Sequence, residues 1–159
     1  MEADRGVHDT RRWAAAWLTL CLAFALHVVD EAANDFLLWY NPNALALRAR
    51  VPWLPVPVLT FEVWITGLAI AVFTLTALTP LVRRGRRWLV PLAYVYGGIH
   101  VANALSHITV SIVGRWFAPG VYSSPVLLAS AVWLLYETTR YRPRTASSAE
   151  SDGLAVSKQ

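Results

Sequence analysis

The sequence predicts an all-α protein, an integral membrane four-helix transmembrane bundle, on three observations. Hydrophobic residues make up 56% of the 159 residues and charged residues only 15%, well above and below the averages of soluble domains. Four apolar runs each approach the ~20 residues that a helix needs to cross ~30 Å of hydrocarbon. The chain also holds eight Trp and six Tyr, amphipathic rings that favour the membrane interface.

Three segments of different composition follow one another along the chain. Residues 1–12 form a polar N-terminal segment, and residues 13–139 form the four-span membrane domain. Residues 140–159 are Ser-rich and charged, so we expect a disordered tail. The four spans are expected at about residues 13–36, 56–79, 88–113 and 121–139.

The connection between the first two spans is rich in proline. Pro42 is expected to end the first helix, and three further prolines up to Pro57 exclude a regular helix over this segment. Together with Trp39 and Trp53, this composition predicts a loop that lies along the membrane interface.

The distribution of basic residues predicts the orientation of the bundle. Four spans place both termini on one side, which would hold all the Lys and Arg residues except Arg48, Arg50 and Arg115. Because Lys and Arg concentrate in cytoplasmic loops, both termini of this multi-pass cell-membrane protein are expected in the cytoplasm. The arginines flank apolar runs and form no single basic face, so the expected partner is the lipid bilayer and not nucleic acid.

Ionisable residues inside the first predicted span indicate a functional site. His27 and Glu31 are four positions apart, so they share a helix face, and Asp30 lies beside them. Charged side chains at membrane depth are costly and usually face a protein interior or a cavity. The two acids could instead mark the outer end of the helix, although Trp39 places the interface further along the chain.

Two other predicted spans carry polar residues at a similar depth. Glu62 comes early in the returning second span, roughly 9 Å from its start. The third span carries His100, Asn103 and His107 at the spacing of one helix face. We therefore expect a shared polar pocket in the outer half of the membrane. Structural roles stay open as alternatives: an interfacial position for Glu62, and helix–helix hydrogen bonding for the others.

Two short motifs resemble those of a known family. The sequence is similar, at His27-Val-Val-Asp30-Glu31 and Asn103-Ala-Leu-Ser-His107, to the HXXEE family of small four-span bacterial membrane proteins. The stretch 116–121 looks like the family's turn before its last span. At Asp30, where the family usually has Glu, the charge is kept and the reach is one methylene shorter. The resemblance implies a four-span membrane fold with a site at the motif residues, in a family without a settled activity.

The first functional hypothesis is an intramembrane acid–base enzyme that acts on a lipophilic small molecule, as an isomerase, a cyclase or a hydrolase. In a low-dielectric pocket a carboxylic acid can stay protonated and donate, while a histidine accepts or relays a proton. We expect Glu31 and Glu62 as acids, His27 and His107 as base or relay, and Asn103 as an orienting donor.

The second hypothesis is a metal-dependent membrane enzyme. No cofactor is predicted outright, but zinc or non-haem iron would find nitrogen and oxygen ligands in His27, Glu31, Glu62 and His107. The spacings of di-iron bundles and zinc proteases are absent from the sequence, and the single cysteine gives no cysteine metal cluster.

The third hypothesis is a non-enzymatic protein that binds or transports a small molecule. Four spans are few for a transporter monomer, although a homo-oligomer could transport, and no inverted repeat is visible in the sequence. The predicted inner halves of the spans are almost wholly apolar, which favours a closed pocket over a path through the membrane.

Overall fold

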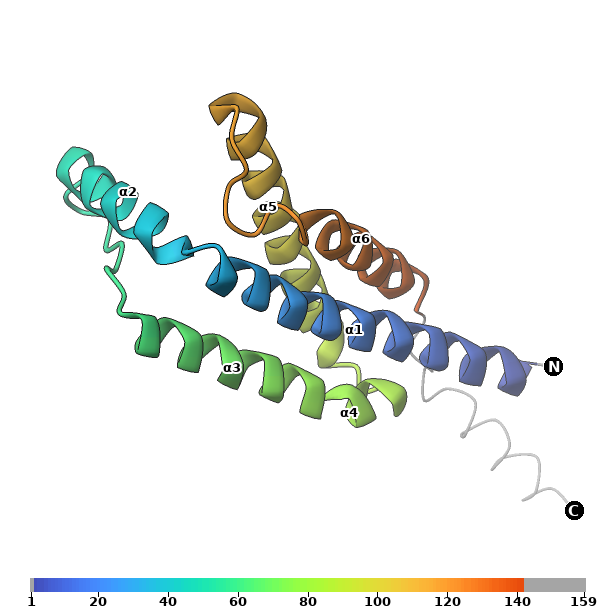
Figure 1. Cartoon of the computed structure of the whole chain (residues 1–159). Coiled ribbons are helices and arrows are strands. Elements are labelled where there is room, and N and C mark those ends of the chain that lie inside the picture. The colour runs from blue at the N-terminus through green and yellow to red at the C-terminus, as the bar shows by residue number, and fades with distance from the viewer. Residues whose placement is uncertain (1, 142–159) are drawn as a thin grey trace, which may run out of the picture.

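The computed structural model describes residues 2–141, and within this range the chain forms helices and no strands (Figure 1). The prediction of an all-α fold is therefore confirmed. The helices, in chain order, are α1 (Glu2–Ala33), α2 (Phe36–Arg50), α3 (Phe61–Ala77), α4 (Thr79–Arg83), α5 (Leu89–Gly114) and α6 (Ser124–Arg140). The expected disordered tail lies, except for its first two residues, outside the described range.

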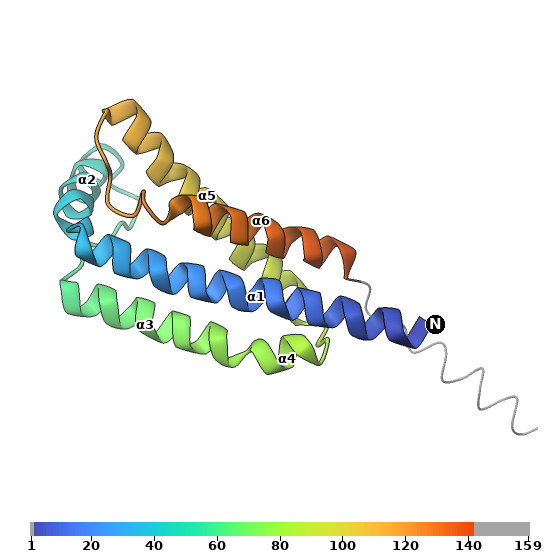
Figure 2. The same ribbon diagram turned by 45° about the vertical axis from the view of Figure 1, so that its right-hand side comes forward.

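The long helix α1 is the centre of the arrangement. It packs against α3 and α4 on one side and against α6 on the other, while α5 packs mainly against α6 (Figures 1 and 2). Glycine permits the close approach of α5 to α6, because a Cβ on Gly97 would lie 2.8 Å from the side chain of Leu135. The chain between α5 and α6 returns over the end of α1, where it meets the motif residues.

One face of α1 forms most of the core. Its buried apolar residues recur every three or four positions, at Trp13, Trp17, Leu20 and Phe24, which is the spacing of one helix face. The indole nitrogen of Trp17 donates a hydrogen bond to the carbonyl of Leu75 on α3 at 2.9 Å. The same face of α1 continues towards the motif, so core packing fixes the direction in which the motif points.

The start of α1 and the end of α6 meet at one end of the molecule. The guanidinium of Arg12 forms an ion pair with Glu137 at 2.9 Å, and the rings of Trp13 and Tyr141 stack at 4.5 Å. The hydroxyl of Tyr141 donates to the carbonyl of Gly85, in the arginine-rich turn before α5, at 2.8 Å. Burial raises the pKa of the Tyr141 phenol, against the opposing charge of a nearby arginine, so the hydroxyl keeps its proton at ordinary pH.

Within the described residues, two helical stretches are long and apolar enough to cross a membrane. They are Thr10–Ala33, with a mean hydropathy of 1.6, and Phe61–Arg83, with a mean hydropathy of 2.0. Polar side chains lower the hydropathy of α5, and α6 has only 17 residues. By length and composition, therefore, two of the four expected spans are candidates for membrane-spanning helices.

The connection after α1 differs from the predicted loop. The first helix ends at Ala33, Asp35 adopts a left-handed conformation with φ of 53°, and α2 then runs through Pro42 to Arg50. Pro42 costs one backbone hydrogen bond, but the helix is held by neighbouring contacts. The amide of Asn41 donates to the carbonyl of Leu59 at 2.9 Å, and its oxygen accepts from the backbone nitrogen of Leu59 at 3.1 Å.

Candidate functional site

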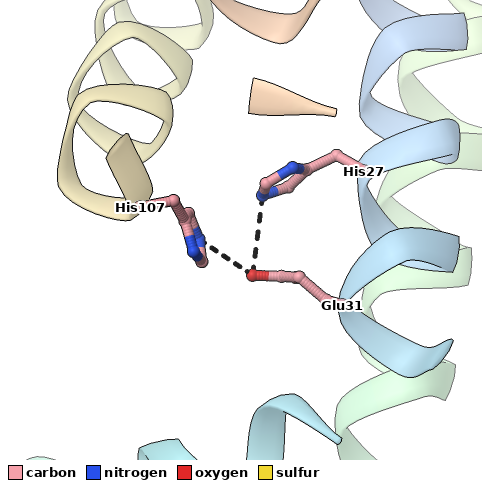
Figure 3. Close-up of side chains that lie close together, drawn as sticks. All are labelled: His27, Glu31 and His107. Carbon is pink, nitrogen blue, oxygen red and sulfur yellow. Dashed lines mark ion pairs between the residues drawn. The ribbon is translucent and has the colours of Figure 1, made fainter. Parts of the chain in front are cut away.

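Three ionisable side chains meet where the end of α1 faces α5, and we call them the His–Glu–His cluster: His27, Glu31 and His107 (Figure 3). Oε1 of Glu31 lies 3.1 Å from Nε2 of His107 and 3.5 Å from Nε2 of His27. All three residues are buried. The carboxylate therefore lies between two imidazoles and close enough to share a proton with them.

The helix period explains why these residues meet. His27 and Glu31 continue the buried face of α1 by one and two turns beyond Phe24. On α5, the buried residues Tyr96, His100, Ala104 and His107 also recur at helical spacing. The buried face of α1 and the buried face of α5 therefore bring their histidines and Glu31 together at the same end of the core.

His27 is held at both ring nitrogens. Its Nδ1 lies 2.8 Å from Oγ of Ser123, and its Nε2 lies 3.0 Å from the amide nitrogen of Asn103. Ser123 in turn lies against Asp30, whose Oδ2 accepts from the Ser123 hydroxyl at 2.7 Å and from the Ser123 backbone nitrogen at 2.8 Å. Asp30 is therefore joined to His27 through one serine.

This network assigns the tautomer of His27. A serine hydroxyl has one proton, and the carboxylate of Asp30 is its strongest and nearest acceptor. Oγ of Ser123 must then accept a hydrogen bond from Nδ1–H of His27. The lone pair of Nε2 then accepts a hydrogen bond from the amide of Asn103, and it becomes available as a base when that amide turns away.

Gly120 covers the cluster. Its φ of +85° lies in the left-handed region that favours glycine, and a Cβ there would lie 2.8 Å from Cε1 of His27 and 3.1 Å from Cε1 of His107. Its carbonyl accepts a hydrogen bond from the hydroxyl of Ser124 at 2.8 Å and lies 3.1 Å from Oγ of Ser123. The turn between α5 and α6 therefore closes over the imidazoles, and only a residue without a side chain fits.

Aromatic rings form another wall of the site. Phe36, at the start of α2, lies 6.1 Å from the ring of His107 and stacks with Trp64 of α3 at 5.7 Å. These rings separate the cluster from the first turns of α3. The faces of aromatic rings carry partial negative charge, so these rings can also attract a cation.

The sequence-predicted residues on α1 and α5 divide into two groups. Asn103 contacts the cluster directly, and Asp30 reaches it through Ser123. His100 is buried apart from the cluster: its Nδ1–H donates to the carbonyl of Tyr96 at 2.9 Å, and its ring packs edge-on against Phe24 at 4.5 Å. His100 thus occupies the core one turn below the site.

Glu62 does not join the cluster, contrary to the sequence prediction. It lies in the first turn of α3 with an exposed side chain. Trp64 is the buried residue of this helix, and residues two positions apart point about 200° away from each other around a helix. The rotation of α3 therefore turns Glu62 away from His107. The negative charge of Glu62 interacts favourably with the positive end of the helix dipole, which accounts for an acid in the first turn of α3.

Ser123 and Gly120 are the residues that sequence reasoning missed. Both lie in the connection between α5 and α6, where no helical period predicts which side chain points inward. The stretch 116–121 carried a family resemblance, and this was the available signal for Gly120. Ser123 lies just beyond that stretch and looks like an ordinary residue before a helix start.

The donor set of the cluster also matches a metal site. Two imidazole nitrogens and a carboxylate oxygen lie within 4.8 Å of one another, and two His with one Glu is a ligand set of catalytic zinc. A hydrogen-bonded second ring nitrogen, as in the contact of His27 with Ser123, is typical of metal-binding histidines. The amide of Asn103 already occupies Nε2 of His27, so Asn103 would have to move before a metal could bind there.

The fold and the site define a helical protein with a buried histidine–carboxylate cluster between its first and its penultimate long helix. A family model described as "Protein of unknown function with HXXEE motif" matches residues 17–134. The chain belongs to the HXXEE family. The matched range contains every residue of the cluster and of its hydrogen-bonding partners. Comparisons with curated proteins and with solved structures each give no match.

Proposed function

We propose that the chain is a four-span integral membrane enzyme, and that its His–Glu–His cluster transfers protons to and from a lipophilic small molecule. One observation carries the proposal: a continuous hydrogen-bonded chain runs from Asp30 through Ser123 and His27 to Asn103, with Glu31 between the two imidazoles. A buried core histidine without a chemical role needs one partner, whereas this network fixes both nitrogens of His27.

The surface of the helices supports membrane placement. α3 buries only Trp64 and exposes large apolar residues, among them Val63, Ile70 and Phe73, which would be unfavourable in water over such an area. At 1.5 Å per residue α5 is about 39 Å long and α6 about 26 Å, long enough to cross ~30 Å of hydrocarbon or nearly so. The proposed domains are the polar residues 1–12, the membrane domain 13–139 and the cytoplasmic tail 140–159.

The meeting of the two chain ends supports the proposed topology. The Arg12–Glu137 ion pair and the hydrogen bond from Tyr141 to Gly85 bring the start of α1, the end of α6 and the arginine-rich turn together. Placing this end in the cytoplasm agrees with the bias of Lys and Arg. The His–Glu–His cluster then lies in the outer half of the bilayer.

The geometry suits an isomerisation in which one proton is added and another is removed. The pair of Glu31 and His107 donates its shared proton to one end of the double bond, which leaves a carbocation. Nε2 of His27, once the Asn103 amide turns away, then removes a proton from the carbon beside the cation, and the resulting imidazolium is stabilised through Ser123 by Asp30. The proton returns from Nε2 of His27 to Oε1 of Glu31, 3.5 Å away, and this restores the starting state. Atoms and charge balance, and Phe36 lies close enough to steady a developing carbocation.

Deuterium labelling tests this proposal, because an isomerisation leaves the mass of its product unchanged. Membranes that contain the protein would be incubated in heavy water with a total lipid extract, followed by mass spectrometry of deuterium at carbon. Wild type should label at least one lipid, and Glu31→Gln should label it about 100-fold more slowly or less. Glu62→Gln, which removes an acid outside the cluster, should match wild type. Equal labelling by Glu31→Gln and wild type would overturn the proposal.

A metalloenzyme is the second candidate, favoured by the 4.8 Å grouping of the three donor atoms. Metal content of detergent-purified protein separates the candidates. Zinc or iron at one equivalent in wild type, lost in a His27→Ala, His107→Ala double variant, would assign the cluster to a metal. Less than a tenth of an equivalent in both would leave proton transfer by the side chains alone.

A further inference from the structure

A groove at the opposite end of the molecule from the cluster has a mixed basic and apolar lining. It lies between α1 and the junction of α3 with α4 and has a volume of about 380 Å³. We call it the arginine groove, and it is lined by Arg11, Ala14, Ala15, Leu18, Thr79 and Arg83. None of these residues takes part in the proposed proton transfer.

The two arginines of the groove come from different helices and are both exposed. No ion pair joins either of them to an acid among the described side chains, whereas the neighbouring Arg12 is bound to Glu137 at 2.9 Å. Two guanidinium groups on either side of one groove repel each other unless an anion lies between them. Guanidinium groups bind phosphate through paired N–H donors, which suits this arrangement.

The rest of the groove is apolar. Ala14 and Ala15 leave room along α1, and Leu18 extends the apolar surface one turn further along the same helix. Oγ1 of Thr79 is buried, has no hydrogen-bond partner in the described part of the chain and does not open onto the groove. A ligand with an anionic head and an apolar chain would match the two arginines and the apolar lining.

We propose that the arginine groove binds an anionic phospholipid of the inner leaflet, with its phosphate between Arg11 and Arg83 and an acyl chain along Ala14, Ala15 and Leu18. The inference rests on the proposed membrane placement, which puts the groove at the cytoplasmic surface. Anionic lipids are concentrated in that leaflet, and basic pockets between membrane helices on that side bind their head groups.

Native mass spectrometry of the delipidated, detergent-purified full chain tests the site with two defined lipids, phosphatidylglycerol and phosphatidylcholine. Wild type should retain phosphatidylglycerol in preference, and an Arg11→Gln, Arg83→Gln double variant should bind it about tenfold more weakly. The matched control is Arg48→Gln, Arg50→Gln, which removes the same charge from the exposed end of α2. It should keep the preference of wild type.

Three results would overturn the lipid site: equal binding of the two lipids by wild type, equal loss in both double variants, or displacement of phosphatidylglycerol by inorganic phosphate alone. The accessibility of a C-terminal tag in intact cells reports the topology independently. A protein with cytoplasmic termini and no lipid preference would contradict the lipid site alone. A failure of proton transfer would show in the Glu31→Gln labelling experiment and leave the lipid result standing.

Discussion

His27 has a defined tautomer because Ser123 stands between it and Asp30. The hydroxyl proton of Ser123 goes to the carboxylate, so Nδ1 of His27 must donate and Nε2 must accept. A serine in this place acts as a positioning residue, since it touches the base and not the substrate. Its contribution can be separated from folding by comparison with Ser124, whose hydroxyl donates to Gly120 alone.

We predict that Ser123→Ala lowers the rate of deuterium transfer by about 10–100-fold, because partners that orient a functional histidine contribute about this much. The measurement is the labelling rate in heavy water across a range of pH. The variant should also change the shape of the pH profile, since the hydrogen-bonded link from His27 to Asp30 is broken. Ser124→Ala should keep both the rate and the profile; the same change in both variants would assign a merely structural role to Ser123.

At Gly120 we predict that Gly120→Ala destabilises the protein by about 1–3 kcal/mol, from a strained left-handed backbone and a Cβ placed 2.8 Å from His27. Thermal unfolding in detergent measures the loss. Gly98→Ala is the control, because a Cβ at Gly98 meets nothing within 4 Å. A melting temperature of Gly120→Ala at or above that of Gly98→Ala would contradict the prediction.

At the scale of elements, the helical period predicted which residues of one helix share a face. It did not predict which face of a helix turns towards its neighbours. The spacing of His27 and Glu31, and of Asn103 and His107, placed each pair on a buried face. The prediction for Glu62 was wrong because the sequence did not show which face of α3 turns inward, and Trp64 takes the buried direction.

The connections between helices were predicted less well than the helices. α2 forms despite Pro42, since side-chain contacts to the segment before α3 compensate for the lost backbone hydrogen bond. Ser123 could not be assigned from sequence, because its role depends on how the turn after α5 folds back onto α1. Such long-range contacts leave no local periodicity to detect.

The contact between α1 and α6 carries a prediction of its own. Glu137 is buried and accepts hydrogen bonds from Arg12 and from the indole nitrogen of Trp133. Arg12→Gln should lower the free energy of unfolding by about 1–3 kcal/mol, because it leaves a buried carboxylate short of a charged donor. Thermal unfolding in detergent, with Arg84→Gln as the exposed control, measures the difference. Equal melting temperatures would show that Arg12 contributes nothing to this contact.

For the whole molecule, the proposed topology predicts the location of each connection. Reporter fusions after Gly85 and after Arg140 should report the cytoplasm, and a fusion after Arg115 should report the outer side. Charge bias and the meeting of the two chain ends both lead to this expectation. A cytoplasmic signal from the fusion after Arg115 would mean that α5 does not cross the membrane and would remove the four-span arrangement.

The composition of the cluster has a consequence for biosynthesis. His27 and Glu31 lie on α1, which leaves the ribosome before the helix and the turn that carry His107 and Ser123. A newly inserted α1 would carry an imidazole and a carboxylate without their partners, and it would gain them only when α5 and the following turn arrive. Under the proposed membrane placement, chains that stop before the turn after α5 would therefore expose unpaired polar groups to lipid, which would allow quality-control proteases to distinguish them from finished molecules.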